Sequence, residues 1–82
     1  MTKARSEPVA MTTVDIMKDG EKVLAMSSRK VHGQSDAAIA AAMLTTYLLA
    51  RHRGTAFEIA KNESRGVASS TVKGVHFLAV SA

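Results

Sequence analysis

Apolar residues recur at helical spacing over residues 34–54, the longest periodic stretch of the chain. The interior of this segment is rich in Ala and Leu, which are the best helix formers. Ser35 or Asp36 is placed to cap its N-terminus, because a short side-chain oxygen accepts hydrogen bonds from the first free backbone N–H groups. Gly54 then suits the left-handed residue that often ends a helix. The pattern therefore predicts one amphipathic helix within these bounds.

Two extended segments precede the helix. Apolar and polar residues alternate over residues 10–17 with the period of a half-buried strand, and a second strand is expected over residues 22–31. Asp19-Gly20 lies between the two and indicates a hairpin, because both residues tolerate positive φ. A two-residue loop fixes the cross-strand pairs. On the predicted core face these are Ile16 with Val23, Val14 with Ala25 and Thr12 with Ser27, and on the reverse face they are Met17 with Lys22, Asp15 with Leu24 and Thr13 with Met26.

Two further extended segments follow the helix. Residues 55–61 predict a strand with Phe57 and Ile59 facing inward, and a polar, turn-like stretch comes after it. Residues 71–81 predict the last strand. Apolar residues occupy both of its faces, which indicates an interior strand or one that a partner covers. Residues 67–70 either begin this strand or belong to the preceding loop.

Together these elements predict an α+β domain in the order β-β-α-β-β, with an antiparallel sheet that carries the helix on one face. The domain spans residues 10–82, and residues 1–9 are expected to form a flexible N-terminal tail. The predicted core packs Ile39, Met43, Leu44 and Tyr47 of the helix onto Val14, Ile16, Val23, Phe57, Ile59, Val75 and Phe77.

The predicted fold leaves more apolar surface than one helix and one sheet face need. Met17, Leu24 and Met26 are expected on the reverse of the sheet, and Leu49 on the reverse of the helix. Either the small domain wraps its helix deeply, or part of this surface meets another copy or another protein. We take these four residues as candidates for self-association and predict a homodimer.

The composition limits the classes of function. Eighty-two residues make a single domain with a modest core, and the absence of Cys excludes disulfides, thiolate catalysis and cysteine metal sites. Neither a signal peptide nor a run of membrane-spanning length is recognisable, so a cytoplasmic location is expected. The net charge of +4 favours acidic partners, either nucleic acid or an acidic protein surface.

No group of residues has the pattern of an active site or of a cofactor or metal site. His32, His52 and His76 show no ligand spacing, and none of the serines lies in a nucleophile elbow. His32, Ser35 and Asp36 have the residue types of a catalytic triad, but they are crowded into one turn where Asp36 is better explained as a helix cap. We therefore expect a protein without enzymatic activity, cofactor or metal.

The basic residues are the remaining candidates for binding. The candidate partner-binding residues are Arg29, Lys30, Arg51, Arg53, Lys61 and Arg65. As an alternative function, these six together with Lys73 would bind nucleic acid. Phosphate binding needs several cations along one track, and stacking on single strands needs exposed aromatic residues. The three aromatic residues all fall at core positions of the pattern.

The hairpin sequence VDIMKDGEKVLA, followed by SDAAIAAAM at the start of an Ala-rich helix, resembles a small phage-encoded type I anti-CRISPR protein over residues 12–48. The resemblance implies a non-enzymatic inhibitor in the cytoplasm of a bacterial host. Such an inhibitor binds a subunit of the CRISPR surveillance complex and blocks its use of target DNA. Many inhibitors of this kind are acidic and imitate DNA, whereas this chain is basic, so it is expected to meet an acidic protein surface or to contact nucleic acid. The match lies in scaffold positions and carries over no binding residue.

Overall fold

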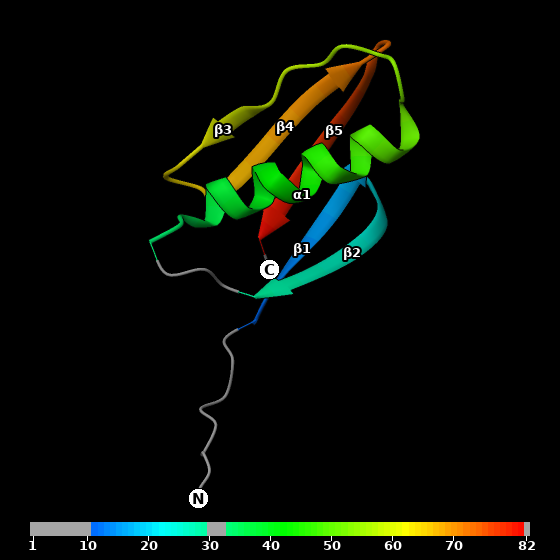
Figure 1. Ribbon diagram of the computed structural model, residues 1–82. Helices are drawn as coiled ribbons and strands as arrows, with labels where there is room; N and C mark the ends of the chain where they lie inside the picture. Colours follow the sequence, from blue (N-terminus) through cyan, green and yellow to red (C-terminus); the bar gives the residue numbers. More distant parts are fainter. Residues whose placement is uncertain (1–10, 30–32, 82) are drawn as a thin grey trace, which may run out of the picture.

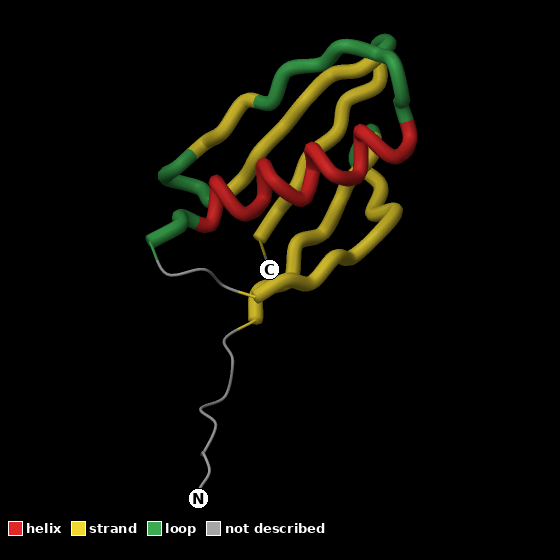
Figure 2. Tube along the Cα trace, in the orientation of Figure 1, coloured by secondary structure: helices red, strands yellow, loops and turns green. Residues whose placement is uncertain are grey.

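The computed structural model describes residues 11–29 and 33–81, so the predicted tail over residues 1–9, Lys30 and His32 lie outside the described residues. The elements are β1 (Met11–Lys18), β2 (Glu21–Arg29), α1 (Asp36–Arg51), β3 (Ala60–Asn62), β4 (Val67–Val72) and β5 (Val75–Ser81). The strands form one antiparallel sheet in the order β2-β1-β5-β4-β3. Figure 1 shows α1 lying diagonally across one face of this sheet, and Figure 2 shows the same two layers by element type. The α+β class and the single helix are confirmed.

The first hairpin forms around the predicted turn. Next to the turn its register is the predicted one, but from Ile16 onward the strand pairs differ from the prediction. Asp19 and Gly20 have φ values of 48° and 87°, as a two-residue turn of this kind requires. The pairs nearest the turn are Lys18 with Glu21 and Met17 with Lys22. A β-bulge then places Val23 as an extra residue, so that Ile16 pairs with Leu24, Val14 with Met26 and Thr12 with Ser28.

The bulge reverses the faces that were predicted for the rest of β2. Because cross-strand partners share a face of the sheet, Leu24 lies on the same side as the fully buried Ile16, and Met26 on the same side as Val14. The prediction that Leu24 and Met26 share the reverse face with Met17 is therefore wrong. Val23, which was predicted in the core, is 45% exposed.

The second half of the chain contains one more strand than predicted. Of the predicted strand over residues 55–61, only Ala60 and Lys61 pair with a neighbour, and β3 extends one residue further to Asn62. The predicted last strand is interrupted by a turn at Lys73 and Gly74, whose φ values are 52° and 79°. This turn joins β4 to β5 as a second hairpin. β5 lies between β1 and β4, which confirms that it is an interior strand.

The helix begins as predicted. Ser35 is the N-cap, and its Oγ accepts a hydrogen bond from the backbone N–H of Ala38 at 3.1 Å. Asp36 places negative charge in the first turn, where it complements the helix dipole. The helix ends three residues before the predicted Gly54, where the backbone N–H of the C-cap His52 donates to the carbonyl of Leu48 at 2.7 Å.

The core lies between α1 and the β1, β4 and β5 strands. Its fully buried members include Leu44 and Leu48 of the helix and Val14, Ile16 and Ala79 of the sheet. The rings of Tyr47 and Phe77 lie 5.9 Å apart in a tilted arrangement, which places most of the chain's aromatic surface at the centre. Every predicted core residue except Val23 belongs to this cluster or packs against it.

The helix does not cover the sheet evenly, and this asymmetry decides which surfaces stay open. α1 packs mainly on β4 and β5, reaches β3, and touches β1 only at its margin. On the β3 side, Phe57 and Ile59 pack against the core. Leu49, in the last turn of the helix, is 57% exposed. None of the side chains of β2 is buried.

Candidate interaction surfaces

An apolar strip runs along the edge strand β2. We call Val23, Leu24 and Met26 the β2 strip. Leu24 is 39% exposed, and Met26 is half-buried and packs against the core from the uncovered side of the helix. Met17 is the one predicted self-association residue that does lie on the reverse face of the sheet, where it is half-buried and pairs with Leu78 of β5. The four candidates therefore do not form one surface, because the bulge separates Met17 from Leu24 and Met26.

A second surface lies at the C-terminal end of α1. We call Leu49, Arg51 and Arg53 the helix-end patch, and all three are exposed. The guanidinium of Arg51 lies 5.2 Å from the ring centroid of Tyr47, so a cation–π contact restricts its orientation. Half-buried His52 packs edge-on against Phe77 at 5.6 Å and anchors the chain at this point. Leu49, Arg51 and Arg53 are thus exposed at the same end of α1, but Leu49 and Arg51 are two residues apart on the helix and project from different faces of it.

The other predicted partner-binding residues do not join the helix-end patch. Arg65 lies near the start of α1, because its neighbour Gly66 closely approaches Asp36. A Cβ built on Gly66 would lie 3.1 Å from the Cβ of Asp36. Since α1 has 16 residues and rises ~1.5 Å per residue, this end is ~24 Å from Arg51. Lys61 lies on β3 and pairs with Glu63 at 3.8 Å. Arg29 is exposed at the end of β2, and the predicted Lys30 is outside the described residues.

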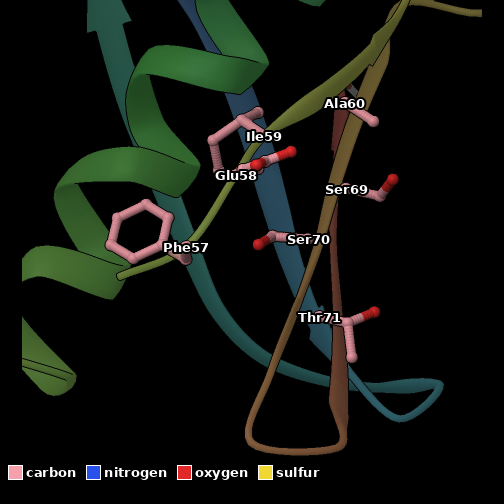
Figure 3. A pocket seen from close by; sticks show the side chains of 7 residues that line it. All are labelled: Phe57, Glu58, Ile59, Ala60, Ser69, Ser70 and Thr71. Carbon is pink, nitrogen blue, oxygen red and sulfur yellow. The ribbon is translucent and has the colours of Figure 1, made fainter. Parts of the chain in front are cut away.

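A groove opens where the sheet stops pairing. β3 pairs Ala60 with Ser69, and a continued ladder would pair Ile59 with Ser70 and Glu58 with Thr71. The chain instead leaves β4 at Ile59, and the gap is a groove of about 510 Å³. Its lining consists of Phe57, Glu58, Ile59, Ala60, Ser69, Ser70 and Thr71. Figure 3 shows Ser70 pointing toward the segment that carries Phe57 and Glu58, while Ser69 and Thr71 point to the other side of β4.

The groove holds hydroxyl groups but little to activate them. Ser70 is 6% exposed, and among the described residues its Oγ has no hydrogen-bond partner. A serine nucleophile needs a base within hydrogen-bond reach, and Glu58 is the only titratable residue in the lining. This arrangement can accept a hydrogen-bonding group but does not form a catalytic constellation. Sequence patterns do not predict this groove, because the groove forms at the point where the chain separates from β4.

The described residues contain neither a cluster of metal ligands nor a helix that could span a membrane. In this part of the chain, no three His, Asp or Glu side chains gather closely enough to hold a metal ion. His52 and His76 lie on different elements, at the end of α1 and in β5. Residues 11–29 and 33–81 contain no helix with the length and apolar content to cross a membrane. Comparisons with protein-family models, curated proteins and solved structures give no significant match.

Proposed function

We propose that this chain is a non-enzymatic inhibitor that acts by binding another protein, and that it is of the anti-CRISPR kind. It binds a subunit of a type I CRISPR surveillance complex in the cytoplasm of a bacterial host and blocks the use of target DNA. It acts as a homodimer. The observation that carries the protein-binding part of the proposal is the helix-end patch, where Leu49 is 57% exposed at the same end of α1 as the exposed Arg51 and Arg53.

The helix-end patch contains Arg, one of the residue types that are enriched in protein-binding hot spots. In such sites Trp, Tyr or Arg is surrounded by contacts that exclude water, whereas Leu is under-represented. The ring of Tyr47 already orients Arg51, so less side-chain entropy is lost when a partner binds. Because Arg51 and Arg53 are both cationic and the whole chain carries +4, the matching surface on the partner is acidic.

The test is inhibition of purified type I surveillance complexes. Binding of target DNA by a panel of such complexes is measured by gel mobility shift with increasing inhibitor. We expect at least one complex to be inhibited, and Leu49→Asp to raise the half-inhibitory concentration at least ~10-fold, because it places a charge in the centre of the contact. The double variant Arg51→Ala/Arg53→Ala should weaken inhibition more at low salt than at high salt.

A matched control removes two cations from the other end of the molecule. Lys61→Ala/Arg65→Ala lowers the net charge by the same amount but leaves the helix-end patch intact. An equal loss of inhibition in both double variants would mean that net charge, not the patch, drives binding. If no complex in the panel is inhibited, the anti-CRISPR proposal is wrong.

The alternative function, nucleic-acid binding, makes a different prediction in the same assays. Affinity for free DNA or RNA would fall steeply with salt concentration, because each neutralised phosphate releases a counterion. Arg51 and Arg53 lie at one end of the ~24 Å helix and Arg65 near the other, while Lys61 lies on β3 and Arg29 on β2, and this placement favours a protein partner over one phosphate track. Tight, salt-sensitive binding to DNA or RNA without the complex would reverse this preference.

A further inference from the structure

The two edges of the sheet differ in how they are protected. β3 forms one edge with only three residues, which are polar or small, and its Lys61 is paired with Glu63. β2 forms the other edge with nine residues. Short length and charged residues protect an edge strand from pairing with another chain, whereas a long apolar edge invites such pairing. Only the β3 edge has this protection along its full length.

The bulge in β2 protects only the end near the hairpin turn. Val23 is the extra residue, and Lys22 beside it pairs with Asp15 at 3.5 Å. From Leu24 to Arg29, β2 pairs with β1 without any irregularity. This stretch therefore presents a straight row of outward backbone N–H and C=O groups, with the apolar side chains of Leu24 and Met26 beside it.

We propose that a second copy of this chain pairs antiparallel with the first along β2, about a two-fold axis at Ala25. The two five-stranded sheets merge into one continuous sheet with both helices on the same face. The inference rests on the homodimer of the proposed function and assigns its interface. It uses the β2 strip and leaves the helix-end patch free for the other partner.

The register follows from symmetry and side-chain chemistry. A two-fold axis normal to the sheet pairs residues of the same face, so the axis must pass through a residue position. An axis at Ala25 places Leu24 opposite the partner's Met26, and the same contact repeats on the other side of the axis. An axis at Met26 would instead place Leu24 opposite a serine, and one at Ser27 would place Met26 opposite a serine. Only the Ala25 register gives both Leu24 and Met26 an apolar partner.

Charge complementarity supports the same register. The antiparallel arrangement brings Arg29 of each copy beside the hairpin turn of the other, where the partner's Asp19 and the partner's Glu21 carry negative charge. Two cations near that turn, Lys18 and Lys22, could repel the incoming Arg29, but neither faces it directly. Lys22 is paired with Asp15, and Lys18 lies on β1, one strand further from the edge. Each end of the interface therefore joins a cation to an acidic turn.

The test measures mass in solution by light scattering between ~1 and ~100 μM. We expect the wild-type chain to approach twice its 8.7 kDa mass as concentration rises. Glu21→Arg and Arg29→Glu should each raise the dimer dissociation constant at least ~10-fold, because each brings like charges together at both ends of the interface. An equimolar mixture of the two variants should restore dimerisation, since every contact then joins opposite charges.

Further variants separate loss of pairing from loss of folding. Leu24→Arg should abolish the dimer, because it places a charge beside the two-fold axis on a side chain that is already 39% exposed, while the far-UV circular dichroism stays unchanged. Lys61→Glu on the β3 edge is the matched charge reversal and should leave the dimer intact.

The possible results distinguish the β2 interface from the homodimer and from the proposed inhibitory function. A monomeric mass at ~100 μM would overturn both the β2 interface and the homodimer of the proposed function. A dimer that is insensitive to all three β2 substitutions would overturn the β2 interface alone. A dimer that responds as expected but inhibits no surveillance complex would leave the interface standing and overturn the proposed function.

Discussion

Neighbouring leucines on α1 give the sharpest test of which helix face is buried. Leu48 is fully buried in the core, whereas Leu49 is 57% exposed in the same last turn of the helix. Truncating a fully buried leucine to alanine removes its transfer free energy and leaves a cavity, at a cost of ~3–4 kcal/mol. Truncating the exposed leucine should change stability by less than ~0.5 kcal/mol, since alanine is also a slightly better helix former.

The size of the domain makes this difference easy to measure. At ~0.05–0.15 kcal/mol per residue, 82 residues give a total stability of ~4–12 kcal/mol. Leu48→Ala should therefore remove about a quarter or more of the free energy of unfolding and lower Tm by ~15–25 °C. Urea unfolding followed by circular dichroism measures both variants at one protein concentration, because self-association adds concentration-dependent stability. Equal losses, or a larger loss for Leu49→Ala, would refute the packing of the helix described above.

Three further predictions concern the cap, the groove and one turn. Ser35→Ala should cost ~1 kcal/mol of unfolding free energy in a urea titration, because it removes the acceptor for the Ala38 N–H at 3.1 Å. Ser70→Ala should stabilise the domain by up to ~1 kcal/mol in the same titration, since it removes a buried hydroxyl that has no partner among the described residues, and a loss would show that the hydroxyl is satisfied. Gly66→Ala should lower Tm more than Gly74→Ala does, because both glycines have positive φ but only at Gly66 would the new Cβ meet a side chain at 3.1 Å; similar shifts would argue against that close approach.

The sequence predicted the helix, its cap and the first turn because each has a local physical signal. The register of β2 was missed because that signal is absent. Val23 to Met26 are four consecutive apolar residues, so alternation does not say which of them face the core. The register then rested on the turn alone, and a single extra residue after the turn reversed the faces.

The second hairpin was missed for two reasons. Its turn is Lys73-Gly74, and a lysine at φ 52° lies outside the Asn-Gly and Asp-Gly patterns that signal such turns. The inward residues of β4 also include Ala68 and Ser70, while Thr71 faces outward. The inward and outward residues therefore differ little in hydrophobicity, and alternation does not mark the strand. The exposed position of Leu49, by contrast, could be predicted, because it depends only on helix phase.

The asymmetry of the sheet gives the physical reason to expect an interface at β2 rather than elsewhere. A single helix of 16 residues covers the β5, β4 and β3 side of the sheet, so β2 adds nothing fully buried to the core. A strand that served only its own domain would gain solubility from polar residues, as the short β3 edge does. β2 instead exposes Leu24 at 39% along an unbroken stretch of ladder. A small domain that keeps apolar side chains on its longest edge strand gains stability from them only when another strand covers them, and the strand whose chemistry fits is β2 itself.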